Sequence, residues 1–204
     1  MLEKIKKHLE QMAPKIVDAL QEPVSDETIE RLEKLIDKKL PEDFIALYKE
    51  HNGLDTDELV NFTYGIPLFP LEESIDILEN YEKYLEKMDL EYADPGIDSS
   101  YTMNMTRVPL RDDGQTLLAI DLAPTEEGTY GQVILIDYEY EVALKLNDSI
   151  TEYLTQFEAD LGNNLYSLQE DALDDDNHWL DPVREIDPVN WFNSPTWKHI
   201  KEQL

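Results

Sequence analysis

The sequence contains no cysteine, and this absence excludes several kinds of chemistry. Without thiols the protein cannot form a disulfide, attack a substrate through sulfur or bind zinc through thiolates. Long apolar runs are missing as well, since no stretch of about 20 apolar residues is present to span a membrane. The first residues, 1–7, include Glu3 and no apolar segment, so we expect no signal peptide and a cytoplasmic location.

Basic residues are scarce. Lys and Arg number 17 against 46 Asp and Glu, which gives the 204-residue chain a formal net charge of −29. A surface this negative repels nucleic-acid phosphates and anionic lipids, so we expect neither nucleic-acid nor membrane binding. It attracts a basic protein and speeds that encounter most strongly at low salt. Solubility alone would also account for the charge, and composition leaves both explanations open.

Catalytic and metal-binding motifs are also absent. The sequence has no GxSxG, GxGxxG, GxxxxGK[ST] or HExxH pattern. Its histidines are scattered at His8, His51, His178 and His199. We therefore expect a non-catalytic protein with no cofactor and no metal site. An enzyme would instead require a pocket with converging polar groups and shifted pKa values.

What the sequence does contain is a series of strand patterns. Residues 107–137 predict two strands joined by a turn at 112–114, then a polar loop and a third strand. The apolar runs 117–120 and 133–136 are typical of strands buried on both faces. Alternation over 141–146 predicts a further strand. The fold class expected is α+β, with a central, mostly antiparallel sheet of about four to six strands covered by helices.

Helical patterns flank these strands. Residues 1–21 predict an amphipathic helix that Pro14 breaks near Met12-Ala13. Ser25 predicts the N-cap of the next helix, and Leu40-Pro41 predicts a sharp corner before another helix. Asn52-Gly53 is expected to close that helix with a left-handed cap.

The remaining segments are less regular. Residues 62–69 predict short or edge strands, because glycine and proline interrupt them. A helix is expected over 71–88, and Ser149 to Glu152 form a capping box for a helix that stops at Gly162. A short helix is expected around 165–173.

Three parts of the chain are expected. Residues 1–24 form an N-terminal helical extension, 25–161 the α+β domain, and 162–204 a Trp-rich C-terminal extension. This last part holds all the tryptophans, Trp179, Trp191 and Trp197, and Ser194-Pro195 could start a final helix. Disordered segments are poor in aromatic residues, so we expect the extension to pack on the domain or on a partner.

Acidic side chains are the candidate partner contacts. Asp112 and Asp113 lie in the turn between two predicted strands. Asp121 ends an otherwise apolar strand beside the loop 124–131. It could contact a partner or accept hydrogen bonds from loop N–H groups, and the second role is the simpler one.

A second group of acids lies near the C-terminus, where five occur within seven residues: Glu170, Asp171, Asp174, Asp175 and Asp176. They could form a solvated turn or a patch for the Lys and Arg side chains of a basic partner. Trp179 would then supply an aromatic anchor of the kind found at binding hot spots. Calcium could also bind to these acids, but the segment lacks the alternate spacing and glycine of an EF-hand loop.

Several motifs resemble those of the SUKH superfamily, and the match covers residues 25–161. Its N-terminal signature is similar to Ile29-Glu30, Leu32-Glu33, Leu40-Pro41-Glu42-Asp43-Phe44 and Asn52-Gly53. Its second signature is similar to Val108-Pro109-Leu110, residues 118–124, Gly128 and Gly131-Gln132-Val133-Ile134. Residues 149–154 resemble its closing helix.

The superfamily includes fungal regulators of cell-wall synthesis and many bacterial immunity proteins. The resemblance implies a protein-binding module, most simply an immunity protein that neutralises a cognate toxin. That toxin would be a basic domain such as a nuclease, whose phosphate-binding cleft an acidic inhibitor could occupy. The alternative is a regulatory scaffold with no toxin partner, as in the fungal branch. The sequence leaves open whether the chain is a monomer or a dimer.

Overall fold

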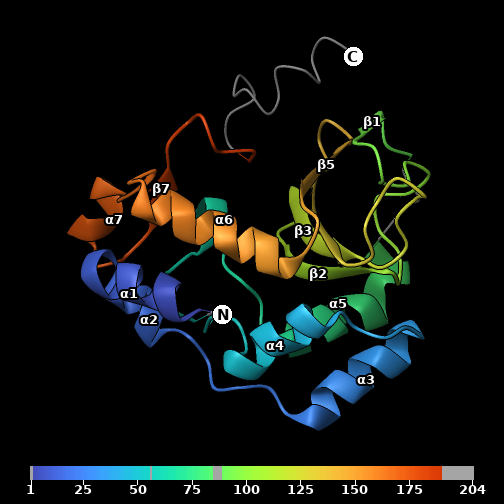
Figure 1. Ribbon diagram of the computed structural model, residues 1–204, viewed down its shortest axis with the longest axis horizontal. Helices are drawn as coiled ribbons and strands as arrows, with labels where there is room; N and C mark the ends of the chain where they lie inside the picture. The colour runs from blue at the N-terminus through green and yellow to red at the C-terminus, as the bar shows by residue number, and fades with distance from the viewer. Residues whose placement is uncertain (1, 56, 85–88, 190–204) are drawn as a thin grey trace.

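The computed structural model describes residues 2–55, 57–84 and 89–189. Trp191, Trp197 and the helix expected after Ser194 lie outside the described residues, as do residues 85–88. Figure 1 shows the main sheet on one side, with α3, α4 and α5 beneath it and α6 running alongside. The α+β fold and the N-terminal helical region are confirmed. Among the described residues, no helix is both long enough and apolar enough to cross a bilayer.

The N-terminal region forms two helices, α1 (Glu3–Met12) and α2 (Pro14–Asp18). Ala13 separates them with a non-helical φ of −146° and ψ of 56°. Proline lacks the N–H that a continuous helix would need and fits at a first helical position. The predicted break is therefore confirmed, and both helices bury one face through Ile5, Leu9 and Ile16.

Two helices follow, α3 (Asp26–Ile36) and α4 (Glu42–Glu50). The Ser25 side chain accepts a hydrogen bond from the Thr28 N–H at 3.1 Å, which confirms the predicted cap of α3. The predicted left-handed cap of α4 at Asn52-Gly53 is wrong, because α4 ends at Glu50 and is followed by an extended His51. Gly53 does have a φ of +67°, but it lies against the backbone of Phe69.

The main sheet has five strands in the order β1-β5-β4-β3-β2. All its pairs are antiparallel except β1 with β5, so the predicted mostly antiparallel sheet is confirmed. The strands are β1 (Tyr92–Ala93), β2 (Arg107–Asp112), β3 (Thr116–Asp121), β4 (Gln132–Asp137) and β5 (Val142–Asn147). The two-residue β1 is too short to carry a recognisable sequence pattern.

The strands β3 and β4 lie inside the sheet. Every residue of β3 is buried, and all but the last residue of β4 are buried too. Since successive strand residues point to opposite faces, both faces of these strands are covered. The helix α6 (Ile150–Gly162) contacts β4 and β5, and α5 (Leu71–Tyr84) contacts β2. Ser149 caps α6 as predicted, while the Glu152 carboxylate accepts from the Asp148 N–H at 3.2 Å.

Two predicted elements are wrong. Residues 62–69 contain no strand and instead form the 3-10 turn η1 (Thr63–Gly65). Tyr64 and Gly65 both have a positive φ, of 54° and 76°, which an extended strand cannot accommodate. The helix expected around 165–173 is a strand followed by a shorter helix, because Tyr166 and Leu168 pair with a later strand. These elements are β6 (Tyr166–Leu168), α7 (Glu170–Asp174) and β7 (Leu180–Pro182).

Candidate interaction site

Asp121, at the end of β3, is fully buried. Its carboxylate accepts hydrogen bonds from the Ala123 N–H at 2.9 Å and from Gln132 Nε2 at 3.2 Å. Burial raises the pKa of the Asp121 carboxyl above its ordinary value, and these bonds together with nearby Arg107 oppose the shift. Asp121 therefore holds the loop after β3, which is the structural alternative given for it above.

Arg107, at the start of β2, is also fully buried. Its guanidinium donates to the carbonyls of Asp98 at 2.7 Å, of Thr102 at 2.8 Å and of Tyr101. It also lies over the Tyr101 ring, 4.2 Å from the centroid. Arg107 thus ties the loop before β2 to the sheet, and nothing in its sequence context distinguishes it from an exposed arginine.

The turn acids Asp112 and Asp113 have separate roles. Asp112 accepts from the Gly114 N–H at 2.9 Å and from the Tyr138 hydroxyl at 3.1 Å. Asp113 is exposed and accepts from the backbone N–H groups of Gln115 and Thr116. Both acids therefore shape the turn, and Asp113 also faces solvent.

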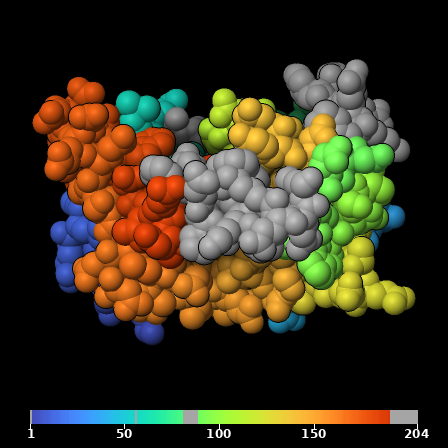
Figure 2. Space-filling model, turned by 90° about the horizontal axis from the view of Figure 1, so that it is seen from above, coloured from blue at the N-terminus to red at the C-terminus, as the bar shows by residue number. Residues whose placement is uncertain are grey.

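The C-terminal acids are all exposed, and we call Glu170, Asp171, Asp174, Asp175 and Asp176 the acidic patch. Asp176 pairs with Lys15 at 2.6 Å. Within the part of the chain that the structure describes, the other four carboxylates make no hydrogen bond or ion pair. Figure 2 shows the orange segments of α6 and α7 across the left and lower part of one face.

Asn61 fixes the strand that follows the acidic patch. Its side-chain amide donates to the Leu180 carbonyl at 2.8 Å and accepts from the Leu180 N–H at 2.8 Å. Asn61 and Leu180 are both completely buried. The asparagine therefore pairs with β7 as a neighbouring strand would, and it sets the positions of Trp179 and Asp181 on either side of Leu180.

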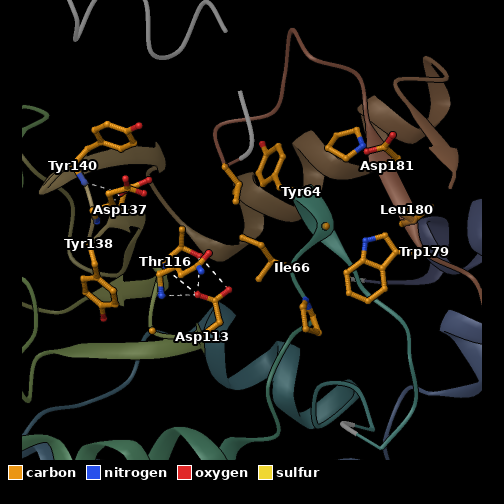
Figure 3. Close-up of a pocket in the computed structure, with 17 residues that line it drawn as sticks. Tyr64, Ile66, Asp113, Thr116, Asp137, Tyr138, Tyr140, Trp179, Leu180 and Asp181 are labelled. Atoms are coloured by element: carbon orange, nitrogen blue, oxygen red, sulfur yellow. Dashed lines mark hydrogen bonds between the residues drawn. The ribbon is translucent and has the colours of Figure 1, made fainter. Parts of the chain in front are cut away.

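A cavity of about 670 Å³ lies between β7, η1 and two turns of the main sheet. Figure 3 shows Asp137, Tyr138 and Tyr140 on one side, with Tyr64, Trp179 and Asp181 on the other. We call it the tyrosine–acid pocket. Its polar and aromatic lining comprises Tyr64, Asp113, Gln115, Thr116, Asp137, Tyr138, Glu139, Tyr140, Trp179 and Asp181.

The tyrosine–acid pocket brings together two of the residues singled out from sequence, Asp113 and Trp179. It does not include Asp112, the buried Asp121 or the acidic patch. Sequence analysis missed Tyr64, Asp181 and the turn after β4. That turn carried a signal, since tyrosine alternates with acids over 137–141 directly after a buried strand.

The charged residues that line the pocket in the described part of the chain are all acidic. Four of its described lining residues are acids, and none is lysine, arginine or histidine. Burial raises the pKa of the Tyr64 and Tyr138 phenols further above neutral. Among the described residues, no group of three or more His, Asp or Glu side chains is placed to hold a metal ion.

Comparison with known proteins gives two kinds of match. A model of the SMI1 / KNR4 family (SUKH-1) matches residues 23–156. "KNR4/SMI1 homolog 2" of Debaryomyces hansenii is 24% identical over 229 aligned positions, which cover 91% of this chain and 38% of the relative. "Glucan synthesis regulatory protein" of Neurospora crassa is 24% identical over 209 positions, which cover 83% and 39%. The chain thus spans about two fifths of the length of these relatives.

The family match covers most of the chain and includes α3, α4, the whole main sheet and the first half of α6. The helix caps, the buried β3 and β4 strands and the loop held by Asp121 all lie inside it. The elements that add Trp179 and Asp181 to the pocket follow it along the chain. The chain belongs to the SMI1 / KNR4 family (SUKH-1).

Proposed function

We propose that this chain is a non-catalytic protein-binding module that captures a basic protein. One observation supports it most directly: Trp179, which follows the acidic patch closely along the chain, lines a pocket that also holds four acids. Complementary charge steers such an encounter, and a tryptophan can anchor it. The proposal predicts no turnover, so conversion of a metabolite by the purified protein would contradict it.

The specific partner that we propose is a basic toxin domain, which the chain would neutralise in the cytoplasm by covering its active cleft. An acidic inhibitor fits a nuclease cleft because its carboxylates can stand where phosphates bind. The test is protection of cells that express the product of the neighbouring gene. Charge reversal of Asp174, Asp175 and Asp176 to Lys should abolish protection.

A matched control reverses three exposed acids far along the chain from the patch, Glu91, Glu126 and Glu127. It changes the net charge equally and should leave protection intact. If both triple variants still protect, the acidic patch is not the contact surface. If no neighbouring gene encodes a toxin, the immunity proposal fails while protein binding remains to be tested.

A second candidate is a regulatory module without a toxin partner. The name of the Neurospora crassa relative, "Glucan synthesis regulatory protein", supports this alternative. A pull-down from the native host separates the two candidates. Recovery of cell-wall synthesis components, with altered glucan content after gene deletion, would favour regulation, whereas recovery of one small basic toxin would favour immunity.

A further inference from the structure

We propose that the tyrosine–acid pocket binds arginine side chains in an extended segment of the protein partner. The inference rests on the proposed protein-binding function and assigns it a place and a chemistry. It concerns a cavity that is separate from the acidic patch. No residue of the acidic patch lines any of the pockets described.

The pocket's charge selects a cation. Asp113, Asp137, Glu139 and Asp181 line it, and no described basic side chain neutralises them from within. Glu139 and Asp181 are exposed, and their carboxylates make no hydrogen bond or ion pair in the described part of the chain. An incoming guanidinium could therefore pair with them without breaking an existing contact.

The pocket's aromatic walls favour arginine over a compact ammonium. Tyr64 and Trp179 lie on the same side of the pocket as Asp181 (Figure 3), so a planar cation could meet a ring face and a carboxylate together. Guanidinium groups stack on aromatic faces more readily than lysine does. Described residues of the chain already make this contact, since Arg107 lies 4.2 Å from the Tyr101 centroid and Arg111 lies 4.7 Å from that of Phe69.

The pocket is preorganised. The Tyr64 N–H donates to the Tyr166 hydroxyl at 3.2 Å, and the Tyr64 ring packs 6.2 Å from that of Tyr153. On the opposite side, Asp137 accepts from the backbone N–H groups of Glu139 and Tyr140, each at 2.9 Å. Walls that are fixed before binding lose little conformational entropy when a ligand arrives.

The pocket's size fits a segment rather than one side chain. Its volume of about 670 Å³ falls within the range of about 300–1,000 Å³ typical of ligand sites. Two or three consecutive residues of a partner could enter it, with one arginine at each acidic wall. A folded surface that offers only isolated lysines would fit less well.

The test is fluorescence polarisation with the full-length chain and a labelled Gly-Arg-Arg-Arg-Gly peptide, compared with the peptide in which citrulline replaces each arginine. Citrulline keeps the shape and removes the charge. We expect the arginine peptide to bind and the citrulline peptide to fail. The double variant E139Q/D181N should weaken binding about tenfold, because it removes two facing charges.

The matched control is D174N/D175N, which removes the same charge from the acidic patch and should change the affinity less than about twofold. Trp179→Leu should also weaken binding, whereas Trp179→Phe should retain most of it. Circular dichroism verifies that each variant is folded.

Four outcomes would overturn the proposal. One is an equal loss of affinity for the arginine peptide in both double variants. Another is the absence of any binding of that peptide by the parent protein. The third is tighter binding of spermidine than of the peptide, which would assign the pocket to a small polycation. The fourth is capture of the native partner by E139Q/D181N with unchanged affinity. That result would rule out the pocket as the binding site and leave the proposed function standing.

Discussion

Arg107 and Asp121 face each other in register across β2 and β3, and neither side chain is exposed to solvent. Burial lowers the pKa of Arg107 and raises that of Asp121, while the charge of each favours the charged form of the other. Arg107 donates to the loop before β2, and Asp121 accepts from the loop after β3. These two buried, oppositely charged residues thus hold two loops at the same end of the sheet.

Replacement of Arg107 by methionine should be strongly destabilising. It leaves the carbonyls of Asp98, Tyr101 and Thr102 without this donor and leaves Asp121 buried without its counter-charge. Removal of one partner of a buried pair costs about 3–5 kcal/mol, to be measured as the free energy of unfolding in urea. The matched control is Arg111→Met, since Arg111 is only half-buried and stacks on Phe69. A loss for Arg107→Met no larger than the control's would refute this account.

Gly53 should tolerate no side chain. Its φ is +67°, and a Cβ would lie 2.4 Å from the Phe69 carbonyl oxygen and 2.7 Å from that of Leu68. Strain at such a φ costs on the order of 1–3 kcal/mol, and the backbone clash adds to it. Gly114 is a control with a φ of +79° and nothing within 4 Å. Thermal denaturation should show Gly53→Ala to be clearly worse than Gly114→Ala, and equal losses would mean that strain alone matters.

Asn61→Ala should loosen the two-stranded sheet of β6 and β7. It leaves the Leu180 N–H and carbonyl buried without their partner, at a cost of about 1–3 kcal/mol for each unpaired group. Hydrogen exchange of β6 and β7 should accelerate while β3 and β4 stay protected. The same variant should weaken binding of the arginine peptide, because Trp179 and Asp181 flank Leu180. Unchanged exchange in β7 would show that other contacts hold the sheet of β6 and β7.

The part of this fold that could be predicted is the part governed by local pattern. The apolar runs 117–120 and 133–136 identified β3 and β4 because a strand buried on both faces needs no polar alternation. Pro14 and Ser25 marked helix boundaries through effects within one turn. The buried acceptor role of Asp121 also followed from its place beside a loop.

The rest depended on contacts between distant segments. Asn61 pairs with Leu180, and Tyr64 is held by Tyr166, across separations that no local pattern encodes. The sequence pattern predicts a helix cap at Gly53, whereas the close backbone of Phe69 explains the glycine. The tyrosine–acid pocket likewise joins turns far apart in sequence, so its acids could be noticed one by one but not as a group.

Asp160 offers a test of buried charge that depends on pH. Its side chain in α6 is 3% exposed and accepts a hydrogen bond from Gln156 Nε2 at 2.7 Å. Burial raises the pKa of this carboxyl in the folded state. A group with a raised folded pKa binds its proton more tightly when folded. Its contribution to stability is therefore full below the unfolded pKa and is lost as pH rises through the folded pKa.

Asp160→Asn keeps an acceptor for Gln156 and removes the charge, so it should be more stable than the parent at neutral pH. The advantage should shrink as pH falls through the raised folded pKa toward the ordinary value for aspartate, because the parent's carboxyl then becomes protonated. Because about 1 kcal/mol moves the midpoint of a chain this size by ~2–4 °C, scanning calorimetry at several pH values can resolve the effect. The exposed Glu152→Gln serves as a control at the other end of α6. An advantage for Asp160→Asn that is constant across pH would mean that packing, not ionisation, separates the two proteins.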